Sequence, residues 1–313
     1  MNIVVAAPYF SILALILAFA VDSLAGEYPA KIHPVIWIGY VISELDGYFR
    51  KIGGLIGGTL FVITVELIFM IILYAVLHLV SFSFVLELMI TAFFLKATFS
   101  IRGMRRHIVP IIDALEREDL GTAREKLSMV VRRRTEDMGP SLISSAAIET
   151  VAEGLVDGVL SPVFYFTIFG VTGAFFYRVA NTFDSNIAYK DSRNFGFGRF
   201  VAILDTVLNY LPARLAAFII YIASSISGIP PVSYDLMANA RIPDSANAGW
   251  PMGAMSNCLG VRLEKPGEYV INDTFPHPGV NDVRKALRLF TISSLISLFI
   301  FSIPVMIFLY TVL

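Results

Sequence analysis

The fold of this chain is decided by one long apolar stretch, residues 52–95, which reads IGGLIGGTLFVITVELIFMIILYAVLHLVSFSFVLELMITAFFL. Its ionisable residues are Glu66, His78 and Glu87. A helix needs about 20 apolar residues to cross a bilayer core of about 30 Å. The stretch is long enough for two such helices, and the polar residues at 81–83 mark a break between them. We therefore predict a helical hairpin that spans a membrane.

The composition of the whole chain also indicates a membrane protein. Of the 313 residues, 56% are hydrophobic and 16% are charged, whereas a soluble domain carries about 25% charged residues. The formal net charge of -1 provides no electrostatic attraction to nucleic acid, so no nucleic-acid partner is expected. The single cysteine, Cys258, excludes an intramolecular disulfide and a thiolate metal cluster.

Four further apolar runs complete the expected membrane part. Residues 3–21 and 290–313 are predicted to span the bilayer. A cleaved signal peptide is an alternative for the first run, but the absence of a basic residue before it favours a retained helix. Residues 155–176 and 201–227 contain charged side chains, which are unfavourable at membrane depth unless they face protein or water. We expect these two runs to be buried or re-entrant helices that line a site.

The polar segments set the expected topology. Lysines and arginines close to membrane helices favour the cytoplasmic side, and residues 96–153 are rich in both. We expect a cytoplasmic helical segment there and a loop at residues 22–51 on the same side. No internal repeat or low-complexity linker interrupts the chain. The prediction is therefore an all-α, polytopic integral membrane protein, with residues 1–313 forming one domain.

The common nucleotide-binding and zinc-protease motifs are absent from the sequence. The glycine cluster Gly53, Gly54, Gly57 and Gly58 suggests a phosphate-binding loop, but no lysine follows it. Close packing of helices through small residues is the favoured interpretation, and it also allows a homo-oligomer.

Three acidic residues, Glu149, Glu153 and Asp157, recur at every fourth position and form one stripe on a helix. A solvated helix face is one interpretation. Because the stripe enters an apolar run, a bound cation or arginine partners are the alternatives, and Mg²⁺ suits carboxylates that bind it together with phosphates. The arginines at 132–134 offer counter-charge or phosphate contacts, or they anchor the chain at the membrane surface.

A second group of polar residues follows the apolar run at 155–176: Arg178, Asn181, Asp184 and Ser185 lie close to one helical face. Helix capping by Asn181 or Asp184 is the alternative to a catalytic role.

Asp205 and Asn209 form a further pair four residues apart, and Arg214 lies beyond the break expected at Pro212. A structural ion pair between Asp205 and Arg214 competes with a functional role, which is the default for ionisable residues inside a membrane.

Taken together, these motifs resemble those of the adenosylcobinamide-phosphate synthases, the CobD/CbiB membrane proteins of cobalamin biosynthesis. The resemblance covers residues 22–269 and is most specific in three segments. The matching motifs are, in order, Asp22, His33-Pro34-Val35, Gly39, Arg134-Thr135, Glu149, Ala152-Glu153, Asp157-Gly158, Pro162, Tyr177-Arg178, Asn181-Thr182-Phe183-Asp184-Ser185, Tyr189-Lys190, Phe195-Gly196, Asp205, Asn209-Tyr210, Pro212-Ala213-Arg214-Leu215 and Asn247-Ala248-Gly249-Trp250-Pro251-Met252. Two positions depart from the family pattern, which usually has Asn in place of Gly154 and Asp in place of Thr206, and this puts the ligand roles near them in doubt.

The resemblance implies an ATP-dependent amide ligation that joins adenosylcobyric acid to aminopropanol phosphate, or to aminopropanol, with Mg²⁺ as cofactor and ATP as co-substrate. It further implies a multi-pass protein of the cell membrane with its active site on the cytoplasmic face. Other membrane enzymes of cobalamin assembly are expected partners beside the lipid bilayer.

The resemblance assigns candidate roles in three classes. The catalytic candidates are His33, Arg134, Glu153 and Asp184. The metal candidates are Glu149, Glu153, Asp157 and Asp184. The substrate-binding candidates are Asp22, Thr135, Asn181, Ser185, Lys190, Arg199, Asp205, Asn209, Arg214, Asn247 and Trp250.

Two of these roles have structural alternatives. His33 is the candidate for proton transfer because imidazole titrates near neutrality, but a histidine before proline also fixes a turn. Trp250 can stack on a corrin or adenine face, or it can be an aromatic residue at the membrane interface.

The alternative function is a non-catalytic corrinoid carrier or a scaffold for pathway enzymes. A transporter is disfavoured, because the membrane runs show no paired broken helices of the kind that inverted repeats produce.

Overall fold

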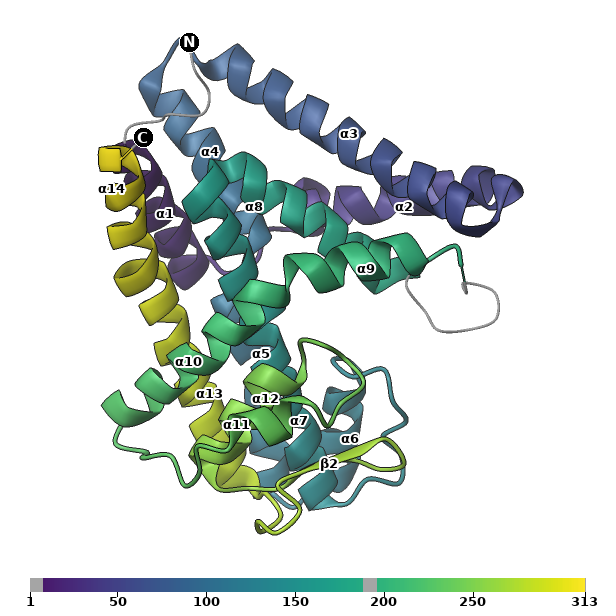
Figure 1. The fold of residues 1–313 in the computed structure, drawn as a ribbon, viewed down its shortest axis with the longest axis vertical. Helices are drawn as coiled ribbons and strands as arrows, with labels where there is room; N and C mark the ends of the chain where they lie inside the picture. Colours follow the sequence, from purple (N-terminus) through teal and green to yellow (C-terminus); the bar gives the residue numbers. More distant parts are fainter. Residues whose placement is uncertain (1–7, 188–195, 313) are drawn as a thin grey trace. The chain divides into compact units, whose positions relative to one another are not determined.

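The computed structural model describes residues 8–187 and 196–312, and most of these are helical (Figure 1). The chain divides into two units, each built from several stretches of sequence. Unit 1 comprises Met1–Ser100, Ser161–Asn209 and Phe301–Leu313, and unit 2 comprises Ile101–Leu160 and Tyr210–Ile300. The all-α prediction is confirmed.

Unit 1 contains most of the apolar helices. Its elements are α1 (Pro8–Leu24), a 3-10 turn (Ala30–Ile32), α2 (Pro34–Ile52), α3 (Gly54–Val80), α4 (Phe84–Thr98), α8 (Ser161–Ile187), α9 (Arg199–Leu208) and α14 (Ser302–Val312). Helix α1 packs against α4 and α14. The predicted hairpin is α3 and α4, and the break lies at residues 81–83, where the Ser83 side chain caps α4. Exposed apolar side chains such as Ile56, Leu67 and Ile71 cover the outer face of α3, as expected for a helix that faces lipid.

The glycine cluster allows close packing, as the sequence indicated. Gly53 and Gly54 have φ values of 71° and 55°, which L side chains rarely adopt, and they let the chain turn from α2 into α3. A Cβ on Gly58 would collide with the backbone carbonyl of Phe197. The phosphate-loop alternative is therefore rejected, and the small residues let the segment before α9 lie directly against α3.

Unit 2 contains shorter helices and one small hairpin. Its elements are α5 (Ile101–Glu116), α6 (Leu120–Ser128), α7 (Pro140–Leu155), a π-helical turn (Val156–Leu160), α10 (Tyr210–Ile226), α11 (Leu236–Ala240), α12 (Gly249–Leu259), β1 (Leu263–Lys265), β2 (Tyr269–Ile271) and α13 (Val280–Leu295), which a second π-helical turn (Ile296–Phe301) connects to α14. Helix α7 lies at the centre of this unit and packs against α13, α12, α6 and β1. The antiparallel strands pair Leu263 with Ile271 and Lys265 with Tyr269.

Four helical stretches among the described residues are long and apolar enough to cross a membrane, or five if the bent pair α9 and α10 forms one span. The four are Gly54–Val80, Phe84–Glu116, Pro140–Ile187 and Val280–Val312. Helix α1 is shorter, at 17 residues, and the first residues of the predicted N-terminal span lie outside the described part.

Three sequence predictions need correction. Residues 22–51 are not a loop, because α2 occupies most of them. Residues 155–176 are not a separate re-entrant helix but part of a helical stretch of 48 residues, Pro140–Ile187, with a π-helical turn and a kink at Gly170. The buried alternative agrees with the structure, in which side chains such as Phe166 and Phe175 are buried. The hairpin of β1 and β2 was not predicted, because each strand has three residues and such short strands produce no alternating pattern. The run 201–227 agrees better, since α9 and α10 meet at a bend of 42°.

Candidate functional site

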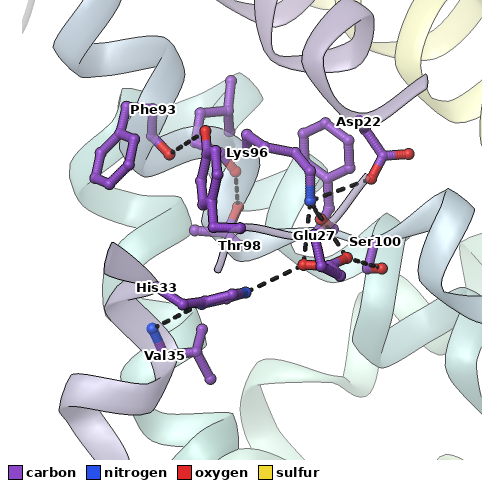
Figure 2. A network of polar contacts seen from close by, with 11 residues as sticks. Asp22, Glu27, His33, Val35, Phe93, Lys96, Thr98 and Ser100 are labelled. Carbon is purple, nitrogen blue, oxygen red and sulfur yellow. Dashed lines mark hydrogen bonds and ion pairs between the residues drawn. The ribbon is translucent and has the colours of Figure 1, made fainter. Parts of the chain in front are cut away.

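Asp22 and His33 lie in one cluster of unit 1, which we call the Lys96 cluster: Asp22, Glu27, His33, Lys96 and Ser100 (Figure 2). Lys96 comes from the last turn of α4 and is completely buried. Its Nζ lies 3.1 Å from Asp22 Oδ1 and 3.3 Å from Glu27 Oε1, and it donates a hydrogen bond of 3.2 Å to the carbonyl of Phe99. The ammonium group is thus surrounded by oxygen acceptors, which compensates for the loss of its hydration.

Glu27 is held in its charged form by this cluster. Burial alone raises its pKa, but the hydrogen bond with His33, the charge of Lys96 and the hydrogen bond from Ser100 together lower the pKa of Glu27 to about 2. The neighbouring hydroxyl of Tyr28 has a pKa raised to about 12 by burial and by the charges of Glu27 and Asp22. At neutral pH the cluster therefore contains an ionised Glu27 beside a protonated tyrosine.

His33 is fixed by both ring nitrogens. Nδ1 accepts a hydrogen bond from the backbone N–H of Val35 at 3.3 Å, so His33 is the N-cap of α2. Nε2 lies 3.1 Å from Glu27 Oε2. Pro34 occupies the first position of the helix, where its missing N–H has no consequence. These contacts favour the turn-forming interpretation of His33, and its proton-transfer role stays a prediction.

A second buried network in unit 1 centres on Asn209, at the break between α9 and α10. Asn209 Oδ1 accepts hydrogen bonds from Ser161 Oγ at 2.6 Å and from Tyr177 at 2.9 Å. Its amide donates to Asp205 Oδ2 at 3.0 Å, and Asp205 Oδ1 accepts from Asn181 at 3.2 Å. We call these five residues the Asn209 network. They join α8 to α9, and they satisfy polar groups that the sequence placed inside an apolar run.

The structure shows how Asn181, Asp184 and Asp205 are placed in unit 1. Helix α8 continues to Ile187, so Asn181 and Asp184 lie inside the helix and do not cap its start. Asn181 also accepts a hydrogen bond from Arg178 at 3.3 Å. Asp184 is half-buried and Ser185 is exposed. Both carboxylate oxygens of Asp205 accept hydrogen bonds from asparagines of unit 1, so the Asn209 network accounts for this carboxylate without Arg214.

In unit 2, Glu149 is enclosed by three donors, which form the Glu149 cluster with it. Glu149 Oε2 accepts from Arg133 and from Tyr269, each at 2.9 Å, and Oε1 accepts from Ser145 at 2.7 Å. The Ser145 hydroxyl also accepts the backbone N–H of Glu264 at 2.7 Å, which fixes the β-hairpin to α7. Burial, with the nearby carboxylates, raises the pKa of Tyr269, so its hydroxyl remains a donor. The arginine-partner interpretation of the acidic stripe is confirmed at Glu149.

The rest of the acidic stripe has different surroundings. Glu153 is exposed, and Asp157 is half-buried within the π-helical turn, an irregularity that is frequent at functional sites. Within residues 8–187 and 196–312, no three His, Cys, Asp or Glu side chains are arranged to hold a metal ion. Carboxylates are the type of side chain through which Mg²⁺ binds to one or two protein ligands together with substrate phosphates, and Glu153 and Asp157 both belong to unit 2. The carboxylates of the acidic stripe do not form a complete protein cage for a metal ion. The fourth metal candidate, Asp184, belongs to unit 1.

A cavity of about 250 Å³ lies beside the Glu149 cluster, and we call it the Arg134 cavity. Its lining residues are Arg133, Arg134, Asp137, Met138, Leu142, Lys265, Pro266 and Glu268. The Arg134 side chain is 89% exposed and lies 3.6 Å from Glu136, so solvent weakens this ion pair. Thr135 is buried and donates to the carbonyl of Arg124 at 3.1 Å. Arg134 is therefore accessible from solvent at the cavity, whereas Thr135 fixes the loop.

Arg214, Asn247 and Trp250 come together elsewhere in unit 2, where with Tyr210 they form the Arg214 cluster. The guanidinium carbon of Arg214 lies 3.4 Å from the ring centroid of Tyr210 and 4.6 Å from that of Trp250. Arg214 also donates to Asn247 Oδ1 at 3.2 Å. Three predicted binding residues are thus brought together, with the Arg214 guanidinium close to two aromatic rings. Of the other predicted residues, Arg199 is exposed at the start of α9, and Lys190 lies outside the described residues.

Comparison with known proteins decides the family. The model of the CobD/Cbib protein family matches residues 15–299. The chain belongs to the CobD/CbiB family. A probable cobalamin biosynthesis protein CobD of Thermoplasma volcanium is 42% identical over 95% of this chain and 98% of its own length. Another from Methanothermobacter thermautotrophicus is 39% identical over 90% of this chain and 92% of its own length. The cobalamin biosynthesis protein CobD of Dehalococcoides mccartyi is 34% identical over 84% of this chain and 87% of its own length. No solved structure matches the chain.

Several polar residues that organise this CobD/CbiB protein were not singled out from its sequence. Glu27 and Lys96 complete the Lys96 cluster, and Tyr269 completes the Glu149 cluster. Lys96 had one sequence indication, because a lysine at the end of an apolar run needs either the membrane surface or a partner. The other partners are distant in sequence, and only the fold brings them together.

The two departures from the family pattern differ in their surroundings. A Cβ on Gly154 would collide with the end of the Met104 side chain from α5, so a larger residue there requires Met104 to move. The hydroxyl of Thr206 donates to the carbonyl of Ala202 at 2.7 Å within α9, and the residue is exposed.

Proposed function

We propose that this CobD/CbiB protein joins adenosylcobyric acid to (R)-1-aminopropan-2-ol O-phosphate, or to aminopropanol, in an ATP-dependent amide ligation of cobalamin biosynthesis. Family membership over residues 15–299 supports a role in this pathway, as do the names of relatives that align over most of their length. The apolar helices support a site in the cell membrane, and the basic residues of unit 2 support a cytoplasmic face for the reaction.

The chemistry needs an activated carboxylate, because a carboxylate oxygen is a poor leaving group. In the proposed first step, a propionate oxygen of the corrinoid attacks the γ-phosphorus of ATP, where the bond to the departing ADP breaks, or the α-phosphorus, where the bond to the departing pyrophosphate breaks. The amine then attacks the acyl carbon, the C–N bond forms, and phosphate or AMP leaves with the bonding electrons. A base takes the proton from the amine. Fixed positive charge must therefore surround the phosphates.

The observation that carries this proposal is the Arg134 cavity. Arg133, Arg134 and Lys265 meet around it, but Arg133 is bound to Glu149, and Lys265 lies 2.7 Å from Glu268. Arg134 is the cation with the weakest protein contact, so a phosphate of ATP can replace Glu136 as its partner. Because a guanidinium binds two phosphate oxygens at once, it also orients the group.

The neighbouring residues have complementary proposed roles. Glu153 and Asp157 would hold Mg²⁺ together with the phosphates. The ion, when bound, neutralises phosphate charge. The Glu149 cluster keeps Arg133 in position beside the cavity. In the Arg214 cluster, the indole of Trp250 and the guanidinium of Arg214 offer a face for the corrin ring and a charge for its carboxylates.

The test is mass spectrometry of reactions that contain the purified full-length protein, adenosylcobyric acid, Mg²⁺, ATP and aminopropanol phosphate, with each component omitted in turn. We expect the amide product in the complete mixture alone, and ADP or AMP identifies the mode of activation. Corrinoid binding without product in any mixture would refute the ligase and favour the carrier or scaffold alternative.

Variants locate the site within the same assay. Arg134→Ala should lower the rate by about 100-fold or more, because it removes a charge that stabilises a transition state. Arg134→Lys keeps the charge and should retain part of the wild-type rate. Asp184→Ala tests the prediction in unit 1. Lys126→Ala is the control, because it removes a half-buried cation of α6 that pairs with the exposed Glu125 and does not line the Arg134 cavity. Full turnover by both alanine variants at Arg134 and Asp184 would show that the site is placed wrongly.

A further inference from the structure

A second cavity in unit 2 lies between α5 and α13, and we call it the α5–α13 groove. It has a volume of about 480 Å³. Aliphatic residues form much of its lining, and the charged lining residues are three arginines and one aspartate. The lining residues are Arg105, Val109, Ile112, Asp113, Arg284, Leu287, Arg288, Thr291 and Ile292. The groove therefore combines an apolar surface with an excess of positive charge.

The positive charge of the groove is only partly neutralised by the protein. Arg284 forms an ion pair with Glu116. Arg105 and Arg288 are exposed, and across the described ranges neither forms an ion pair with a carboxylate. Two guanidinium groups thus remain for an anion. A guanidinium can bind phosphate oxygens through two parallel hydrogen bonds, so phosphate suits these groups well.

The groove lies along the chain where two candidate spans change from apolar to charged. In the stretch Phe84–Glu116, the apolar part ends at Thr98, and Arg105 follows about two helical turns later. In the stretch Val280–Val312, Arg288 precedes the apolar part that begins at Phe290. Basic residues at such boundaries lie at the level of lipid headgroups, and basic pockets between membrane helices bind anionic headgroups.

We propose that the α5–α13 groove binds an anionic phospholipid, independently of the ligase activity. Arg105 and Arg288 hold the headgroup phosphate, and an acyl chain covers the half-buried side chains of Val109 and Ile292. The apolar lining decides between the two sources of phosphate, because a free phosphate ion would leave those side chains exposed to water. A lipid satisfies both the charge and the apolar surface.

The test is native mass spectrometry of the full-length, detergent-solubilised protein titrated with phosphatidylglycerol or phosphatidylcholine. One basic residue near a charged lipid surface contributes about fivefold to the affinity, so Arg105→Gln combined with Arg288→Gln should weaken phosphatidylglycerol binding by about 25-fold. The matched control, Arg106→Gln with Lys285→Gln, removes two exposed cations from the same helices outside the groove. It should leave the affinity within about twofold of the wild type.

Three results would overturn the proposal: equal affinity for both lipids, unchanged phosphatidylglycerol binding by the Arg105/Arg288 double variant, or complete displacement of the lipid by excess inorganic phosphate. The last result would identify a soluble anion as the ligand. If the glutamine variant does not fold, Arg105→Lys with Arg288→Lys replaces it. This variant keeps the charge but loses the paired hydrogen bonds. Its affinity for phosphatidylglycerol should therefore lie between two wild-type values, the affinity for phosphatidylglycerol and the affinity for phosphatidylcholine. An affinity equal to that of the wild type for phosphatidylglycerol would contradict the arginine contacts.

Discussion

The replacement Glu27→Gln tests the Lys96 cluster most directly. Gln is nearly isosteric with protonated Glu, so it removes the charge and keeps the shape. The pKa of Glu27 falls from 4.5 to about 2 in the folded protein. A difference of one in pKa corresponds to about 1.4 kcal/mol of free energy. The charged form is therefore stabilised by about 3 kcal/mol relative to the unfolded chain. The side chain is 29% exposed, so solvent screens part of this effect, and we expect the variant to be less stable by up to about this amount at pH 7.

The pH dependence supplies the sign of the effect. A carboxyl group whose pKa is lowered by folding stabilises the protein above the pKa of the unfolded state, near 4.5, and this contribution is lost as the pH falls through about 2. The stability difference between wild type and Glu27→Gln should therefore be largest above pH 5 and disappear near pH 2. Thermal unfolding in detergent, followed by circular dichroism at a series of pH values, measures this difference. Glu44→Gln, at an exposed position on α2, is the control, and a constant difference between pH 6 and pH 2 would refute the reasoning.

Three further replacements test the other clusters by unfolding measurements and ligand binding. Lys96→Met leaves buried carboxylates without their counter-charge and should lower the stability by about 3–5 kcal/mol; a loss below 1 kcal/mol would contradict the ion pairs. Asn209→Ala removes the acceptor of two buried hydroxyls and should lower the stability by about 1–3 kcal/mol, whereas Thr206→Ala on the exposed face of α9 should change it by less than about 0.5 kcal/mol. Trp250→Ala should weaken corrinoid binding, measured by spectroscopic titration, more than it lowers stability; equal corrinoid affinity would remove Trp250 from the proposed binding surface.

Much of the architecture follows from local properties of the sequence. The hairpin of α3 and α4 was predictable because its apolar length matches a bilayer and because Ser83 begins a new helix. The 22–51 region was misjudged because the apolar part of α2, PVIWIGYVI, is too short for a span and is followed by a polar half, SELDGYFRK. Its start was nevertheless encoded locally, by His33 as N-cap and Pro34 at the first helical position.

The candidate sites were less predictable because their members come from distant parts of the chain. Glu149 and its neighbours could be placed on one stripe from their spacing, but the Tyr269 donor follows 120 residues later. Likewise, Asp205 and Asn209 form a local pair, whereas their partners Asn181 and Ser161 come from α8. Spacing on one helix reveals which side chains share a face, but not which face of another helix meets it.

The sequence by itself determined the helical membrane class, the position of the α3–α4 hairpin and, through its ordered motifs, the resemblance to the family that the comparisons confirm. These properties depend on hydrophobic length and on short motifs, which are local. The tertiary structure alone decided that Lys96 joins Asp22 to Glu27, that Glu149 binds an arginine, and that α5 and α13 enclose a basic and apolar groove. Buried charges and polar groups require compensating partners, and only the packing of distant helices determines which partners they find.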